Sequence, residues 1–125
     1  MDLSLRILIV DDSSTMRKIL TNMLKKIGFT NISVAVNGKT ALEKLKNGKF
    51  DLVFCDWNMP GMLGIDLLKI IRSDNELKDL PFVMVTAEAM KDNIIQAVKA
   101  GVTSYIEKPF SAETVSQELN RILGR

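Results

Sequence analysis

The stretch LVFCDWNMPG, residues 52–61, joins an apolar run to a turn through a single carboxylate, Asp56. The run Leu52–Cys55 has the composition of a strand that is buried on both faces, and Pro60-Gly61 marks a turn after it. An aspartate at such a junction commonly bonds the backbone of its own turn. This stretch alone leaves two interpretations of Asp56 open, a turn residue and a functional carboxylate.

Outward from this stretch, strand-like and helix-like patterns alternate along the chain. The β-branched and apolar runs predict strands at Arg6–Val10, Ile32–Val36, Leu52–Cys55, Phe82–Val85 and Thr103–Ile106. Apolar residues at helical spacing predict helices around Met16–Ile27, Ala41–Leu45, Leu67–Ile71, Ile94–Val98 and Val115–Leu123. Five strands that alternate with five helices predict an α/β fold, with a parallel sheet covered on both faces. The mixed composition of the second and fifth runs indicates edge strands.

Composition excludes several classes of function. The 125 residues suit one domain, and the absence of histidine excludes a Ser-His-Asp triad, a Cys-His pair and a His-ligated zinc site within the chain. The single cysteine, Cys55, excludes an internal disulfide and is interpreted as a core residue. The net charge is +2, and the lysines lie in helical stretches, which indicates solvated faces and no nucleic-acid partner. No long apolar segment is found, so we expect no membrane association and a cytoplasmic location.

Polar residues follow the predicted strands where each one ends. Asp11 and Asp12 follow the first strand, Asp56 the third, Thr86 the fourth and Lys108 the fifth. The carboxyl ends of parallel strands share one edge, and with strand order 2-1-3-4-5 the three acids converge there. Three close carboxylates repel one another unless a cation intervenes, and Mg²⁺ is the hard cation that suits one or two carboxylates plus water. For Asp11-Asp12 alone, an acid pair at a helix N-terminus remains an alternative.

This constellation predicts a chemical role for Asp56. A carboxylate can act as a nucleophile and form an aspartyl phosphate, while a metal ion and Lys108 offset the charge of the transferred group. The turn at Pro60-Gly61 is expected to direct the backbone carbonyl of Asn58 toward the metal.

The motifs DDSSTMRKI, DWNMPGMLG, TAEAMKDNIIQAVKAG and YIEKPF resemble the receiver domain of bacterial response regulators, and most of all its single-domain chemotaxis members. The resemblance covers nearly the whole chain and implies a single receiver domain over residues 1–125. The fold that it implies is the flavodoxin-like (βα)5 doubly wound parallel sheet with strand order 2-1-3-4-5.

The resemblance also implies the residues of the phosphorylation site. Asp56 is the expected phosphorylated residue, and Thr86 and Lys108 are expected to contact the phosphoryl group. Asp12, Asp56 and the Asn58 carbonyl are the expected Mg²⁺ ligands, with Asp11 in support. The Lys108–Pro109 bond is expected to be cis.

Further roles implied by the family concern switching and output. Thr86 and Tyr105 are the expected switch residues, and Asn58 and Glu88 are expected to set the lifetime of the phosphate. The expected partner surface consists of Ala89, Lys91, Ile94 and Tyr105. Met90 departs from the family pattern, which often has a lysine there.

The expected function is that of a stand-alone response regulator in a two-component system. A sensor histidine kinase would phosphorylate it with Mg²⁺, and phosphorylation would change its affinity for the flagellar motor switch protein. A phosphatase is a further expected partner, the chain is expected to be a monomer, and any enzymatic activity is limited to slow self-dephosphorylation. The alternative is a single-domain phosphorelay carrier that does not act on the motor.

Two other classes are weaker alternatives. A phosphohydrolase of the haloacid dehalogenase type usually has a second aspartate two residues after the nucleophile, where this chain has Asn58. An FMN-binding module would need a Ser/Thr/Gly-rich phosphate loop after the first strand, where this chain has Asp11 and Asp12.

Overall fold

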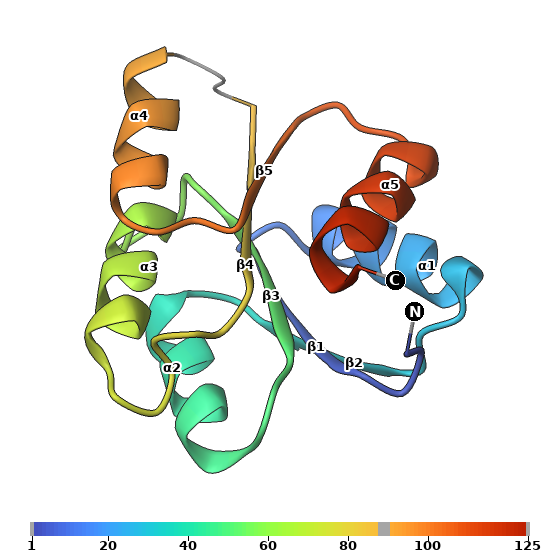
Figure 1. The fold of residues 1–125 in the computed structure, drawn as a ribbon, viewed down its shortest axis with the longest axis horizontal. Helices are drawn as coiled ribbons and strands as arrows, with labels where there is room; N and C mark the ends of the chain where they lie inside the picture. The colour runs from blue at the N-terminus through green and yellow to red at the C-terminus, as the bar shows by residue number, and fades with distance from the viewer. Residues whose placement is uncertain (1, 88–90, 125) are drawn as a thin grey trace.

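The computed structural model describes residues 2–87 and 91–124 and contains one five-stranded parallel sheet (Figure 1). The strands lie in the order β2-β1-β3-β4-β5, which confirms the predicted flavodoxin-like topology. Their bounds are β1 Arg6–Val10, β2 Asn31–Ala35, β3 Leu52–Asp56, β4 Phe82–Thr86 and β5 Ser104–Glu107. The two strands of mixed composition, β2 and β5, form the edges as predicted.

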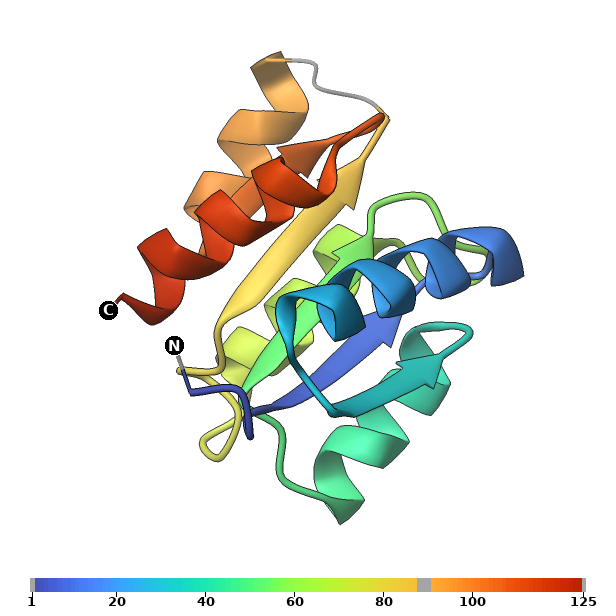
Figure 2. The same ribbon diagram turned by 90° about the vertical axis from the view of Figure 1, so that its right-hand side faces the viewer.

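Five helices cover the two faces of the sheet. Their bounds are α1 Ser14–Ile27, α2 Gly38–Asn47, α3 Gly64–Ser73, α4 Lys91–Lys99 and α5 Ala112–Leu123. Figures 1 and 2 show α1 and α5 together on one face and α2, α3 and α4 on the other. Both ends of α1 are capped: the Ser13 side chain accepts a hydrogen bond from the Met16 amide, and Gly28 ends the helix at a φ of 127°.

The two layers of helices pack on two separate apolar clusters. Along β1, Leu8 and Val10 belong to the cluster under α2 and α3, whereas Ile7 and Ile9 belong to the cluster under α1 and α5. All four side chains are at most 1% exposed. Burial on both faces explains why β1 is continuously apolar instead of alternating. Each such side chain contributes about 1.5–3 kcal/mol through burial.

Several strand ends differ by one residue from the sequence prediction. Asp56 and Thr86 lie inside β3 and β4 as their last residues, because Asp56 still pairs with Val85 and Thr86 with Glu107 on the neighbouring strand. Similarly, β2 begins at Asn31, which pairs with Arg6, and ends one residue earlier than predicted. Pairing with strands from distant parts of the chain sets these ends, so the local composition does not reveal them.

No helix in the described part of the chain is long and apolar enough to cross a membrane.

Candidate functional site

Three carboxylates converge at the carboxyl edge of the sheet. Asp11 and Asp12 follow β1, and Asp56 ends the adjacent β3, whose Cys55 pairs with Val10. One carboxylate oxygen from each acid lies within 4.8 Å of the others. Asp11 is 2% and Asp56 8% exposed, whereas Asp12 is exposed to solvent. The convergence predicted from the strand order is therefore confirmed.

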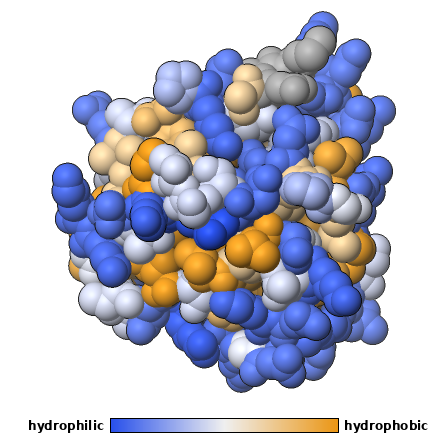
Figure 3. Space-filling model, turned by 180° about the vertical axis from the view of Figure 1, so that it is seen from behind, coloured by the Kyte–Doolittle hydropathy of each residue, from blue (hydrophilic) through white to orange (hydrophobic). Residues whose placement is uncertain are grey.

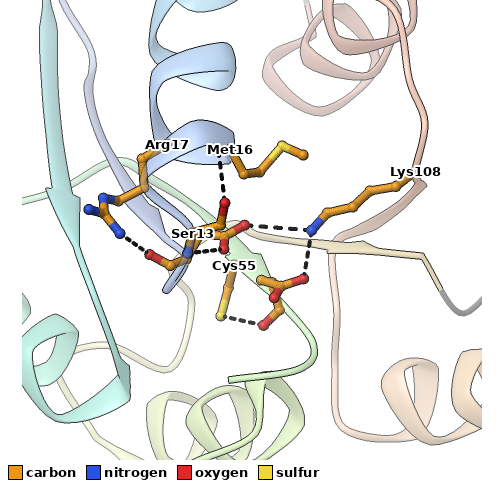
Figure 4. A network of polar contacts seen from close by, with 7 residues as sticks. Ser13, Met16, Arg17, Cys55 and Lys108 are labelled. Atoms are coloured by element: carbon orange, nitrogen blue, oxygen red, sulfur yellow. Dashed lines mark hydrogen bonds and ion pairs between the residues drawn. The ribbon is translucent and has the colours of Figure 1, made fainter. Parts of the chain in front are cut away.

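Lys108 joins this cluster from the end of β5 (Figure 4). Its Nζ donates a hydrogen bond to Asp56 Oδ1 over 3.0 Å and lies 3.6 Å from Asp11 Oδ2. The backbone amide of Lys108 donates to the Thr86 carbonyl over 2.7 Å, which fixes the lysine beside the end of β4. The Lys108–Pro109 bond is cis, as predicted. One ammonium group thus faces two nearly buried carboxylates.

The electrostatic environment of Asp56 disfavours its charged form. Burial raises the pKa of the Asp56 carboxyl above its ordinary value, the hydrogen bond from Lys108 opposes this shift, and the charge of Asp11 adds to it. The hydrogen bond from Lys108 therefore does not fully offset the effect of burial on Asp56. Because carboxylate oxygens are the ligands that hard divalent cations prefer, this donor set fits Mg²⁺.

The first acid is held by the start of α1. Asp11 Oδ1 accepts a hydrogen bond from the Ser13 amide over 2.9 Å, and the Asp11 carbonyl accepts one from Arg17 Nη1 over 2.8 Å. Figure 4 shows these contacts beside the pair formed by Lys108 and Asp56. With one carboxylate oxygen bound to the backbone, Asp11 directs the other toward Lys108. Asp12 is exposed and is the more accessible acid.

A glycine that the sequence analysis missed allows the chain to pass close to Asp56. A Cβ atom on Gly64, at the start of α3, would lie 2.3 Å from the Asp56 carbonyl oxygen. The Gly64 amide also donates to the Trp57 carbonyl over 2.8 Å. Only a residue without a side chain fits there. The GMLG spacing in the sequence was the available signal, but the close contact with β3 depends on the tertiary fold.

The remaining predicted site residues lie at varied depths. Thr86 is fully buried at the end of β4, and Asn58 is exposed two residues after Asp56. Tyr105 is half-buried on β5, where it packs against the cluster under α2 and α3. On α4, Lys91 is exposed and Ile94 half-buried. Glu88 and Ala89, which were predicted to affect phosphate lifetime and partner binding, lie outside the described residues, as does Met90.

A family model for the response regulator receiver domain matches residues 7–120. The chain belongs to the response regulator receiver domain family. Members of this family act in two-component signalling and are signalling proteins, not classical enzymes. All the carboxylates of the cluster and Lys108 lie within the matched region of this receiver domain.

Two chemotaxis proteins that are similar in sequence place the chain more narrowly within this family. The receiver domain is 57% identical to the chemotaxis protein CheY-3 of Vibrio cholerae over 122 residues, which cover 98% of this chain and 94% of that protein. It is 53% identical to the chemotaxis protein CheY of Pseudomonas aeruginosa, with 97% of this chain and 98% of that protein covered. It is therefore a CheY-like receiver domain.

Solved structures agree on the fold. CheY4 of Vibrio cholerae has a TM-score of 0.89 at 31% identity and covers 95% of this chain and 98% of its own. A receiver domain of a sensor histidine kinase from Pseudomonas aeruginosa has a TM-score of 0.87, covers 98% and 99%, and was solved with magnesium coordinated in its active-site cleft. The latter is 23% identical, so its likeness concerns the fold.

Proposed function

We propose that this receiver domain accepts a phosphoryl group on Asp56 from a sensor histidine kinase and thereby changes its affinity for a protein partner. The observation that carries this proposal is the position of Asp56 Oδ1, 3.0 Å from Lys108 Nζ and within a cluster of three acids. In this proposal residues 1–125 act as one stand-alone monomeric domain in the cytoplasm.

The transfer forms one bond and breaks one bond. A carboxylate oxygen of Asp56 attacks the phosphorus atom, while the bond from phosphorus to the donor's imidazole nitrogen breaks and its electron pair stays on that nitrogen. Lys108 offsets the negative charge on the phosphoryl oxygens. Asp12, Asp56 and the Asn58 carbonyl would hold Mg²⁺, with Asp11 in support. The bound metal supplies further charge neutralisation.

The proposed switch uses Thr86 and Tyr105. Thr86 pairs with Glu107 and Met84 with Tyr105, so the two switch residues lie on neighbouring strands. A phosphoryl group on Asp56 offers new acceptor oxygens to the Thr86 hydroxyl and to Lys108, which favours one arrangement of these strands and of α4. A full change in population from 1:99 to 99:1 requires about 5.5 kcal/mol.

The proposed output is control of the flagellar motor switch protein. The names of the chemotaxis relatives support this target. The proposed contact surface consists of Ala89, Lys91, Ile94 and Tyr105. Asn58 and Glu88 are proposed to set the rate of slow self-dephosphorylation, and a phosphatase is a further proposed partner. A single-domain phosphorelay carrier remains the second candidate.

The phosphoacceptor proposal is tested by intact-protein mass spectrometry after incubation with acetyl phosphate and MgCl₂. The wild-type chain is expected to gain the mass of one phosphoryl group, and Asp56→Asn is expected to gain none. The matched control is Asp79→Asn, because Asp79 is an exposed acid before β4, at the opposite edge of the sheet. Phosphorylation of the Asp56→Asn chain would overturn the assignment.

The output proposal needs a separate measurement. Affinity for the N-terminal peptide of a motor switch protein is measured with and without beryllofluoride, a phosphoryl mimic. We expect tighter binding in its presence. Equal affinity in both states would favour the phosphorelay carrier.

A further inference from the structure

The distribution of charge along the chain is strongly uneven. Residues 13–50, which contain α1, β2 and α2, hold eight lysines and arginines and a single acid, Glu43. The rest of the chain holds nine basic residues and fourteen acids. The small net charge therefore conceals a basic part of the molecule, and this part lies at the edge of the sheet formed by β2.

Local structure explains only part of this basic charge. The last turns of α1 and α2 contain Lys25, Lys26, Lys44 and Lys46, where the helix dipole favours cations. Acids favour the positive N-terminal end of a helix, and α3, α4 and α5 have Asp66, Asp92 and Glu113 in their first turns. The first turns of α1 and α2 contain no acid, and Lys39 lies in that of α2. Among the basic side chains of residues 13–50 that the structure describes, Lys46 alone forms an ion pair, with Asp74. The remaining positive charge is left for solvent or a partner.

An apolar groove lies in the middle of this basic region, between α1 and the edge strand. Its volume is about 260 Å³, and Lys18, Asn22 and Val34 contribute to its lining. Val34 is 37% and Val36 46% exposed. On the other side of the strand, Lys44 from α2 donates a hydrogen bond to the Val34 carbonyl. We call Lys18, Asn22, Val34, Val36 and Lys44 the β2 edge face.

Figure 3 shows the molecule from the side on which β2 lies, with hydrophobic residues gathered in the middle and hydrophilic residues around them. An apolar centre with a charged rim is the usual organisation of a protein–protein interface. The groove is smaller than the roughly 300–1,000 Å³ of a site that encloses a whole small molecule. Its size suits an apolar side chain presented by another chain.

We propose that the β2 edge face binds an acidic segment of a partner protein, which inserts an apolar side chain into the groove while its carboxylates contact Lys18 and Lys44. The outward carbonyl of Val34 already accepts a hydrogen bond from Lys44 and is not open to a further strand. The partner therefore contacts side chains and does not extend the sheet. The face contains none of the three clustered carboxylates, although Arg17, which donates to the Asp11 carbonyl, also lines the groove.

Charge complementarity selects this occupant over others. A concave apolar groove gives specificity to a peptide with an apolar anchor, whereas a nucleic-acid backbone or a flat lipid surface requires positive charge alone. Opposite charges across an interface raise the association rate and orient the partner. Binding should therefore weaken as salt rises, because the lysines are exposed and screened over about 10 Å at 0.1 M ionic strength.

The test uses a fluorescein-labelled helical peptide of alternating Glu and Leu pairs as the probe, with fluorescence polarisation at 50 mM NaCl. The wild-type receiver domain is expected to bind this peptide, and to bind a version with Gln in place of Glu about ten-fold more weakly. Lys18→Glu/Lys44→Glu is expected to lose at least ten-fold in affinity. The matched control, Lys78→Glu/Lys99→Glu, reverses two exposed charges outside residues 13–50 and should remain within two-fold of wild type.

Location and competing occupants are resolved in the same experiment. Amide chemical shifts of ¹⁵N-labelled protein should move at Val34 and Lys18 when the peptide is added, and acetyl phosphate phosphorylation of both double variants should be unchanged. The proposal is overturned if the probe does not bind, if the shifts lie elsewhere, or if both double variants lose affinity equally. It is also overturned if duplex DNA or phosphatidylserine vesicles bind the same lysines more tightly, or if light scattering shows that a second copy covers this face.

Discussion

The two ends of the sheet treat charge in opposite ways. At the carboxyl end, three acids cluster, one lysine contacts two of them, and burial raises the pKa of the Asp56 carboxyl. At the amino end, Arg72 donates to the carbonyls of Gly101, Lys78 and Leu80. The comparison teaches that charged groups in this fold are hydrogen-bonded where they support the structure. Like charges are held close together where a ligand is expected.

At the amino end of the sheet, the hydrogen bonds of Arg72 connect several segments of the chain. Arg72 comes from α3, and its three carbonyl partners lie in the segments that precede β4 and β5. Burial lowers the pKa of its guanidinium, and the charge of Asp79 opposes this shift. One side chain therefore ties together a helix and two loops that are distant in the sequence.

Arg72→Ala should have the largest effect on stability. Hydrogen bonds from a charged group contribute about 1.5–3 kcal/mol each and are not additive, so we expect the free energy of unfolding to fall by about 2–4 kcal/mol. Urea unfolding followed by circular dichroism measures this change. Arg121→Ala is the control, because Arg121 is exposed and pairs with Glu118 one turn away, which predicts a loss under about 1 kcal/mol. Equal losses in both variants would contradict a special role for the amino end.

Asp56→Asn should change the free energy of unfolding in the opposite direction. In buffer without Mg²⁺, replacing one of three crowded carboxylates with a neutral amide should raise the free energy of unfolding, because burial and the charge of Asp11 disfavour ionised Asp56. Thermal unfolding with and without MgCl₂ checks this: Mg²⁺ should raise the Tm of the wild type and have little effect on the variant. Asp79→Asn should show the same rise in Tm with MgCl₂ as the wild type, because Asp79 lies outside the acid cluster. A less stable Asp56→Asn chain without Mg²⁺ would show that the acids are not in conflict.

Ser104→Ala should have the smallest effect on stability. It removes one hydrogen bond from Glu118, an acid that also pairs with Arg121. The hydrogen bond from Ser104 lowers the pKa of Glu118, burial opposes this, and Arg121 lowers it further. A lowered pKa means that ionised Glu118 stabilises the fold above its ordinary value of 4.5, and that this contribution is lost as pH falls through the folded value.

The Ser104→Ala variant should therefore show a Glu118 pKa closer to 4.5, measured by NMR titration of its side-chain carbon. Stability between neutral pH and about pH 3 should then fall less steeply than in wild type. Ser73→Ala is the control, since the Ser73 hydroxyl donates to the Lys69 carbonyl and to no acid. An unchanged Glu118 titration in Ser104→Ala would contradict the assigned cause.

The carboxyl end was far more predictable from sequence than the amino end. Asp11, Asp12, Asp56 and Lys108 follow apolar runs, so strand periodicity and the geometry of a parallel sheet place them together. Arg72 lies in a helix with no local sign of its partners, which are 6 to 29 residues away in the chain. Gly64 was missed for the same reason, because its close contact with the Asp56 carbonyl arises between two packed elements.

The functional roles divide in a similar way. The family and fold follow from motif and topology, and both expectations are confirmed. The switching roles of Thr86 and Tyr105 stay predictions, because they concern a change between two states of the molecule. Strand ends were wrong by one residue where ladder partners extend a strand, as at Asp56 and Thr86.

The buried Cys55 gives this protein an internal reporter of opening. It is the sole thiol in the chain, is 0% exposed, and lies next to Asp56 on the central strand β3. Burial raises the pKa of its thiol well above the ordinary value, which lowers its reactivity in the closed fold. Alkylation of Cys55 therefore measures how often β3 becomes accessible. A cysteine introduced on the surface can be labelled selectively while Cys55 remains in place.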